Sequence, residues 1–152
     1  MPVGEPLDFF EKFDFVVEID GIRRAGFKTC SELSMEIGKV ELREGGRSIP
    51  HKKPGLVSFT DVTLERGATN DLDLYEWARE TADASSGRGE VAEKYKRNLD
   101  VVVLDRDGSE RRRYTLNKAW PVKYVAGEWD AEGEEAVVES ITLTFDFFEK
   151  TA

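Results

Sequence analysis

The stretch Phe13-Asp-Phe-Val-Val-Glu-Ile-Asp-Gly21 places an apolar residue at every second position and ends in a dipeptide suited to a tight turn. A period of two built from aromatic and β-branched residues predicts a strand with one buried face. Asp20-Gly21 favours a two-residue type I′ turn because glycine adopts positive φ without steric cost. We therefore expect an antiparallel hairpin whose return strand runs from Ile22 to Phe27.

The same alternation recurs along most of the chain and predicts further antiparallel strands. They are expected at Leu33–Leu42, Val57–Glu65, Leu99–Leu104, Arg111–Leu116, Val122–Val125 and Ala136–Phe148. The phase of the alternation changes near Gly38, which indicates a bulge or a bend. Helical spacing behind the N-cap candidates Thr69-Asn-Asp71 predicts one helix that runs to about Ala82. The fold class is therefore mainly β: an antiparallel β-barrel or sandwich of about eight strands with one flanking α-helix, in a single domain over residues 1–152.

Two segments interrupt this pattern. Residues 1–12 carry two prolines and little periodicity, and we interpret them as an N-terminal arm. Residues 43–55 carry two prolines and three glycines, which predicts a long loop between strands. Loops of about 12 residues or more without structure of their own are uncommon in compact domains and usually have a function. We expect this loop to reach a neighbouring subunit.

Composition excludes several classes of protein. The 152 residues carry a net charge of −9, which disfavours nucleic-acid binding through phosphate contacts. The single cysteine cannot form an internal disulfide, which suits assembly in a reducing cytoplasm. The chain shows no signal-peptide pattern at its start and no run of about 20 apolar residues, so we expect no membrane anchor.

A search for chemistry along the sequence yields no candidate catalytic, cofactor-binding or metal-binding residue. His51 is the only histidine and lies in a segment rich in proline and lysine, which removes most triads and metal sites. Cys30 follows a strand without any local nucleophile signature. Asp105-Arg-Asp-Gly108 has two of the positions of a calcium loop, but Asp-Gly is expected at a hairpin turn in any case. We therefore expect a protein that is not an enzyme and needs no cofactor.

The order of several short motifs is more informative than any one of them. These motifs are Phe15-Val-Val-Glu-Ile-Asp-Gly21, Ala25-Gly-Phe27, Cys30-Ser-Glu-Leu33, Arg43-Glu-Gly-Gly46, Lys53-Pro-Gly55, Leu64-Glu-Arg-Gly67, Leu74-Tyr-Glu-Trp77, Asn117-Lys-Ala-Trp-Pro-Val-Lys-Tyr124 and Glu139-Ser-Ile-Thr-Leu143. Together, over about residues 8–148, they resemble the tail tube family of contractile phages and extracellular contractile injection systems, which is similar to the tube proteins of type VI secretion. Residues 144–149 depart from the histidine–glutamate pair frequent in the family, and residues 83–97 are longer and more polar than the family pattern.

The resemblance implies a structural role. Six copies would form a ring, and rings would stack into a hollow tube that holds or delivers a payload of protein or DNA. The implied partners are further copies of the chain, a sheath protein, and baseplate, cap and tape-measure proteins. The particle would assemble in the cytoplasm and be released as a phage tail or an injection particle.

Two groups of residues are candidates for roles in such a tube. We expect Arg43, Glu44, Gly45, Gly46 and Arg47 to form a subunit interface, because charged side chains in a glycine-rich loop serve a partner better than their own core. A ring of six copies would carry a charge of about six times −9, or −54, and part of it is expected to face the lumen. The lumen-facing candidates are Asp14, Glu18, Glu139 and Asp146.

Two other classes of protein remain open from the residues alone. A monomeric or dimeric β-barrel that binds a small apolar ligand would show the same alternation. An enzyme on a split-barrel fold is a third possibility. The ligand-binding barrel does not account for the long loop at residues 43–55 or for the ordered motifs, and rings or tubes seen by electron microscopy would exclude a simple monomeric binder.

Overall fold

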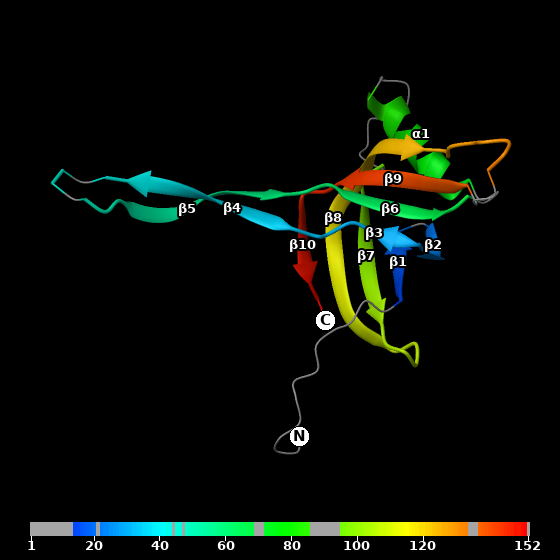
Figure 1. The fold of residues 1–152 in the computed structure, drawn as a ribbon, viewed down its shortest axis with the longest axis horizontal. Coiled ribbons are helices and arrows are strands. Elements are labelled where there is room, and N and C mark those ends of the chain that lie inside the picture. Colours follow the sequence, from blue (N-terminus) through cyan, green and yellow to red (C-terminus); the bar gives the residue numbers. More distant parts are fainter. Residues whose placement is uncertain are drawn as a thin grey trace, which may run out of the picture.

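The computed structural model describes residues 14–20, 22–43, 45–46, 48–68, 72–85, 95–133 and 137–151. These residues form ten strands and one helix (Figure 1). In chain order the elements are β1 (Phe15–Ile19), β2 (Ile22–Gly26), β3 (Thr29–Cys30), β4 (Met35–Leu42), β5 (His51–Phe59), β6 (Val62–Gly67), α1 (Asp73–Ser85), β7 (Arg97–Leu104), β8 (Glu110–Val125), β9 (Val138–Thr144) and β10 (Phe147–Lys150). The mainly β prediction with one helix is confirmed.

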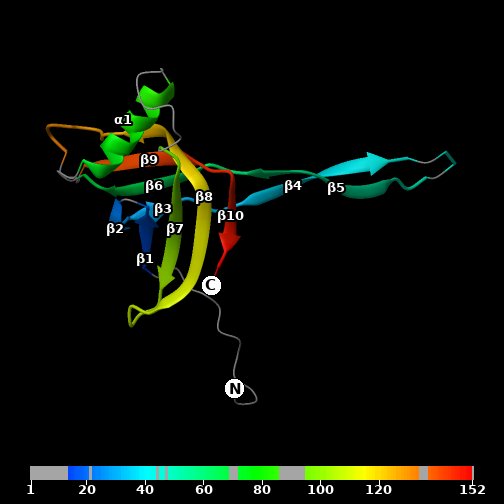
Figure 2. The same ribbon diagram turned by 180° about the vertical axis from the view of Figure 1, so that it is seen from behind.

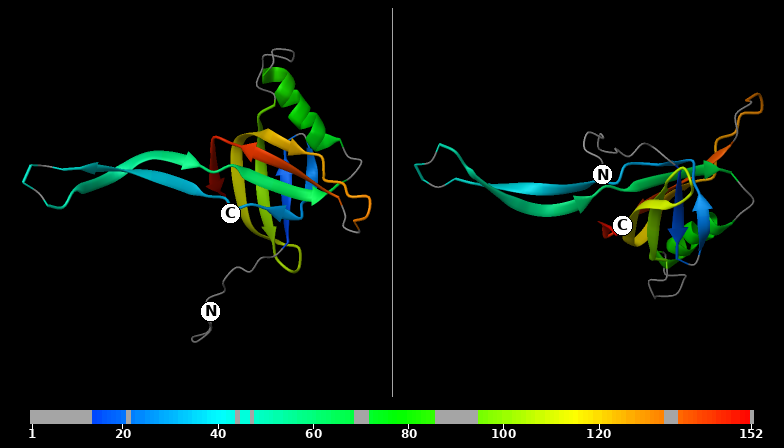
Figure 3. Two further views of the ribbon diagram at one scale, coloured as in Figure 1. Left: turned by 45° about the horizontal axis from the view of Figure 1, so that its top comes forward. Right: turned by 90° about the horizontal axis from the view of Figure 1, so that it is seen from below.

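All strand pairs are antiparallel, and eight strands belong to one strongly bent sheet. Its order is β2-β1-β7-β8-β9-β6-β3, with β10 paired to β8, while β4 and β5 form a separate two-stranded ribbon. No ladder joins β2 to β3 among the described residues, so the sheet stays open and folds into a sandwich instead of a closed barrel. Of the two predicted alternatives, barrel and sandwich, the structure shows the sandwich (Figure 3).

The long strand β8 joins the two layers of the sandwich. Its first part pairs with β7 and β10, and its last part pairs with β9. Between these parts Lys118 has a positive φ of 53°, a conformation that non-glycine residues rarely adopt. The backbone N–H of Lys118 donates to the side-chain carbonyl of Asn98 at 3.2 Å, which holds the chain at this point. The bend lets one strand serve both layers, where the sequence pattern predicts two separate strands.

The core lies between the layers and beneath the helix. Alternate residues of the strands point into it, as the period of two predicts. The largest fully buried side chains are Trp77, Leu64, Leu74, Leu99, Leu116, Ile141, Leu143, Val17, Val62 and Val102. Helix α1 buries Leu74, Trp77 and Thr81 on one side, and the indole N–H of Trp77 donates to the carbonyl of Tyr95 at 2.5 Å. The helix therefore covers one end of the sandwich (Figure 2).

Two boundaries differ from the sequence prediction. The predicted loop at residues 43–55 is shorter than expected, because β5 already begins at His51 and includes Pro54 and Gly55. Proline is tolerated there because, among the described strands, β5 pairs only with β4 and its other edge needs no N–H donor. The predicted strand Val57–Glu65 is two strands, because β5 ends at Phe59 and β6 begins at Val62.

Candidate assembly surfaces

The β4–β5 ribbon projects from the body of the protein as a long arm (Figures 1 and 2). Every residue of β4 is exposed, and so are seven of the nine residues of β5. The arm nevertheless carries large apolar side chains. These are Met35, Ile37, Val40, Leu42, Ile49, Leu56 and Val57, with Leu56 90% exposed. An exposed ribbon with this composition is typical of an interaction surface.

A bulge shapes the middle of the arm, as the phase change near Gly38 predicts. The register shifts between Ile37 and Lys39, where β5 contributes an extra residue. A Cβ atom on Gly38 would lie 3.2 Å from the carbonyl oxygen of Leu56. The close approach explains why glycine occupies this position.

Three of the predicted interface residues, Arg43, Gly45 and Gly46, are described and lie at the far end of this arm. Arg43 is exposed, and Gly46 has a φ of 85°, which a side chain would strain. Gly45 is exposed in the same turn. Glu44 and Arg47 lie outside the described residues. Contact with a neighbouring subunit stays a prediction for all five positions.

The predicted lumen residue Glu18 belongs to a charge network on the outer face of the β1–β7–β8 layer. The guanidinium of Arg113 lies 2.9 Å from a carboxylate oxygen of Glu18 and also binds Asp100 and Glu110. These carboxylates raise the pKa of Arg113, with hydrogen bonds to Glu110 and Glu18 as the leading causes. In the sequence this arginine is part of the basic run Arg111–Arg113, which suggests only a solvated strand face. Three carboxylates around one guanidinium leave an acidic excess on this face.

Glu139 is wrongly placed among the lumen-facing candidates. Glu139 is only 4% exposed, because it lies on the inward face of β9 with Ile141 and Leu143. Directly across the β6–β9 ladder lies Arg66, which is 7% exposed and binds the Glu139 carboxylate. Tyr124 donates its hydroxyl to the other oxygen of the same carboxylate at 2.9 Å. The spacing of two from Ile141 is the sequence signal that places Glu139 on the core face.

Arg66 connects the sheet to the helix. Its guanidinium lies 2.7 Å from Asp73, whose same oxygen accepts the backbone N–H of Leu74 at 2.8 Å. Burial alone would lower the pKa of Arg66, but hydrogen bonds to Asp73 and Glu139 outweigh it and raise the pKa. Arg66 and Glu139 therefore form a charged pair inside the protein. Together with Asp73, this pair has a structural role in holding α1 on β6 and β9.

The other two lumen candidates are exposed. Asp14 precedes β1, where its carbonyl accepts the N–H of Leu104 at 2.8 Å. Asp146 lies in the bend between β9 and β10, where its N–H donates to the carbonyl of Asn117 at 2.9 Å. Both residues are therefore exposed on the surface of the single chain, and their location in the lumen stays a prediction.

An open cleft of about 1040 Å³ lies where β2 and β3 leave the sandwich unclosed. Its lining includes Phe15, Phe27, Cys30, Val103 and Tyr114. Burial raises the pKa of the Cys30 thiol to about 11, so the thiol is neutral near pH 7 and a poor nucleophile.

Within the described part of the chain, no group of three or more His, Cys, Asp or Glu side chains is placed to hold a metal ion. In the same part, no helix is both long and apolar enough to cross a membrane.

The comparison with known families decides the identity. Residues 11–149 match the family described as T4-like virus tail tube protein gp19. The chain belongs to the gp19 tail tube family. This family consists of structural tube proteins, and the resemblance inferred from the ordered motifs is confirmed. No curated protein sequence matches the chain.

Solved structures show the same fold at low sequence identity. A chain in the structure of the anti-feeding prophage cap, a tube terminating cap, is 21% identical with a TM-score of 0.78, covering 99% of this chain and 94% of that one. A chain in the structure of the sheath/tube terminator of an extracellular contractile injection system (PVC) is also 21% identical, with a TM-score of 0.77 and coverages of 99% and 100%. Hcp1 from Flavobacterium johnsoniae is 16% identical with a TM-score of 0.60, covering 91% of this chain and 95% of that one. The gp19 fold of this chain is thus shared across these assemblies.

Proposed function

We propose that this chain is the structural subunit of the inner tube of a contractile phage tail or of a tail-like contractile injection system. Six copies form a ring, and rings stack head to tail into a hollow tube. The observation that carries the proposal is the β4–β5 arm, which is exposed along its length in the single chain and yet carries a row of apolar side chains.

The arm is a poor structure for an isolated chain. A two-stranded hairpin is marginally stable in water, because neither of its faces is packed. Burying an exposed Leu, Ile, Val or Met side chain completely contributes about 1.5–3 kcal/mol. A second copy of the chain that covers the arm therefore supplies the stabilisation that the body of the protein does not.

Free sheet edges support lateral assembly into a ring. Among the described strands, β2 pairs only with β1 and β3 pairs only with β6. Exposed edges carry unpaired N–H and C=O groups that bind a further strand readily. Pairing of these edges between neighbouring subunits extends the sheet around a ring and removes the free edges.

We place the outer face of β1, β7 and β8 toward the lumen, with Asp14, Glu18 and Asp146 as its candidate acidic residues. The carboxylates around Arg113 leave this face acidic. An acidic wall repels a DNA payload and lets it slide, whereas phosphate contacts would hold it in place. A structure of the assembled tube tests this placement, and a neutral or basic inner surface would overturn it while leaving the tube function intact.

The partners follow from the assemblies in which similar folds occur. Similar folds occur in solved structures of a baseplate, a tube terminating cap and a sheath-tube complex. We propose sheath, baseplate, cap and tape-measure proteins as partners of this chain, with assembly in the cytoplasm before release of the particle.

The test uses the full chain and a variant with a shortened arm. Ile37 and Val57 lie directly opposite each other, so an Asn-Gly turn can replace residues 38–56 without disturbing the body. We expect rings and tubes from the full chain by electron microscopy, and a folded variant by circular dichroism that makes no long tubes. Gly67→Ala, at the end of β6 and outside the arm, is the control, because no heavy atom lies within 4 Å of its added Cβ. A strictly monomeric full chain at high concentration would contradict the proposed function.

A further inference from the structure

The far part of the β4–β5 arm is basic in an otherwise acidic protein. Residues 39–53 contain five lysines and arginines and two glutamates, a net charge of +3, whereas the whole chain carries −9. The described basic residues Lys39, Arg43, Lys52 and Lys53 are all exposed. Lys53 lies across the ladder from Val40, so charge and apolar surface share one face of the ribbon.

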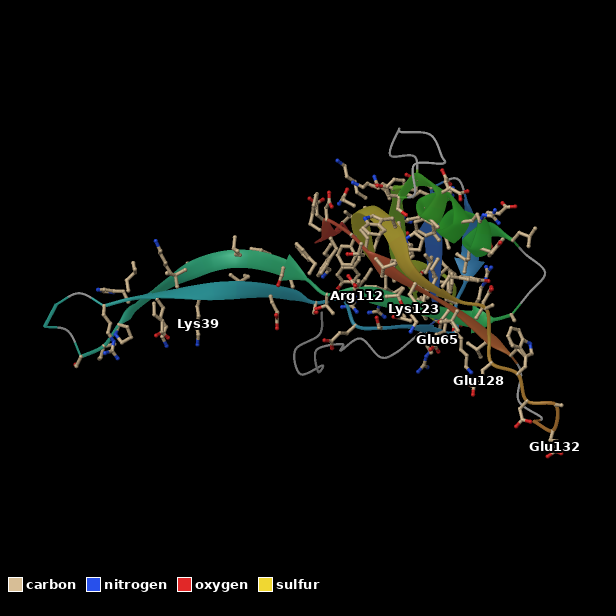
Figure 4. The ribbon with its side chains drawn as sticks, turned by 90° about the horizontal axis from the view of Figure 1, so that it is seen from above. Lys39, Glu65, Arg112, Lys123, Glu128 and Glu132 are labelled. Carbon is tan, nitrogen blue, oxygen red and sulfur yellow. The ribbon has the colours of Figure 1, made fainter. Side chains whose placement is uncertain are left out.

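The opposite end of the molecule carries the complementary charge. Residues 126–133, which lead out of β8, contain three acidic residues and no basic one. All three are exposed: Glu128, Asp130 and Glu132. Figure 4 shows Glu128 and Glu132 at one end of the molecule and Lys39 on the arm at the other end.

This acidic loop also presents a large apolar side chain. Trp129 lies between Glu128 and Asp130 in the sequence and is 71% exposed. Tryptophan is enriched among residues that dominate binding energy at protein interfaces, and its ring attracts lysine and arginine through cation–π contacts. The arm offers Trp129 both apolar and cationic contacts. Leu42 and Leu56 are 48% and 90% exposed and lie near the basic residues of the arm.

Local hydrogen bonds hold the loop in a defined shape. The carboxylate of Asp130 accepts the N–H of Glu132 at 3.0 Å, and its carbonyl accepts the N–H of Gly133 at 3.1 Å. At the base, the N–H of Ala68 donates to the carbonyl of Val137 at 2.9 Å. The loop is therefore presented as a preformed surface, which lowers the entropic cost of binding.

We propose that the basic arm of one copy docks on the acidic loop of the next copy along the tube, with Trp129 packed against the arm. This inference rests on the proposed function and names the surface that receives the arm. The two surfaces lie at opposite ends of one chain and so cannot meet within it (Figure 1). A contact between unlike surfaces repeats without limit when its rotation does not close into a ring, and a stacked tube requires such an open contact along its axis.

Charge exchange between the two surfaces tests the pairing. The loop variant is Glu128→Lys with Glu132→Lys, and the arm variant is Lys39→Glu with Lys53→Glu. Asp130 is left unchanged because it forms the turn of the loop. Two matched controls carry the same changes in net charge at exposed positions elsewhere: Asp61→Lys with Glu149→Lys, and Lys123→Glu with Lys150→Glu.

We expect each of the two test variants to form rings. These rings should stack into tubes at least roughly tenfold shorter than those of the unmodified chain, because a weak surface pair repeats in every subunit of a ring. Combining the two variants in one chain restores tube length, and the controls retain it. Tube length is measured by electron microscopy and ring formation by sedimentation velocity. Loop variants with tubes of normal length, or a combined variant without rescue, would overturn the pairing. Absence of rings from the unmodified chain would instead overturn the proposed function itself.

A cross-link provides a second readout. In a Cys30→Ser background, Leu42→Cys and Trp129→Cys place one thiol on each surface. Mild oxidation is expected to give a ladder of covalent oligomers on a non-reducing gel, and neither single cysteine gives more than a dimer. Oxidised tubes that contain only monomers would contradict the proposed contact.

Discussion

Gly38 and Gly55 meet across the β4–β5 ladder so closely that a Cβ on Gly55 would lie 3.2 Å from the carbonyl oxygen of Gly38. The same Cβ would lie 3.3 Å from a methyl group of Val40. The two backbones meet at the bulge, where the register of the ribbon shifts. A Cβ at either glycine requires its neighbours to move by a few tenths of an ångström, and we expect this displacement at the bulge to change the direction of the arm.

Gly55→Val is therefore expected to change assembly more than stability. The body of the protein makes no use of this glycine, so the midpoint of thermal unfolding should stay close to that of the unmodified chain. Tube formation, measured by electron microscopy, should fall because the arm points in a different direction. Gly67→Ala again serves as the control, and normal tubes from Gly55→Val would show that the bulge geometry is not needed.

Arg66→Met is expected to destabilise the protein by about 3–5 kcal/mol, because it leaves the buried carboxylate of Glu139 without its cation. Urea unfolding followed by circular dichroism measures the loss. Arg79→Met is the matched control, since Arg79 is exposed and lies 3.8 Å from Asp83. Such surface pairs contribute about 0–1 kcal/mol. Equal effects of the two substitutions would contradict a structural role for the internal pair.

Trp77→Phe is expected to cost about 1–3 kcal/mol, because the carbonyl of Tyr95 loses the indole N–H that binds it at 2.5 Å. The substitution also removes the indole ring over which the guanidinium of Arg97 lies at 5.6 Å. Trp129→Phe, at a site that is 71% exposed, should leave the free energy of unfolding nearly unchanged. A loss at Trp129 as large as the loss at Trp77 would be incompatible with these different environments.

Cys30 is expected to react slowly with iodoacetamide in the native protein. Burial raises its pKa from 9.0 to about 11, so the reactive thiolate is scarce at pH 8 and increases only as the pH approaches 11. In urea the labelling rate should follow the ordinary pKa. The same shift means that the stabilisation from the neutral thiol is complete below pH 9 and is lost as the pH rises through 11. Native labelling at pH 8 as fast as in urea would refute the burial.

The strands of the body were predictable because their alternation is a local property of the chain. Val17 and Ile19 point inward from β1, and Ile141 and Leu143 point inward from β9, as the period of two requires. The same rule applied to Glu139 places it with Ile141 on the core face, although its charge suggests the surface. Its partner Arg66 is 73 residues away in sequence, so only the ladder between β6 and β9 reveals that the charge is neutralised inside.

The arm shows where periodicity stops being informative. Leu33–Leu42 alternates like a half-buried strand, yet all of β4 is exposed, because the ribbon leaves the body and meets no second layer. Pro54 and Gly55 suggest a loop, but a strand with a free edge accommodates them. Sequence determined which side chains share a face, since that depends on backbone geometry alone. Tertiary structure decided which faces are covered, since burial depends on what packs against them.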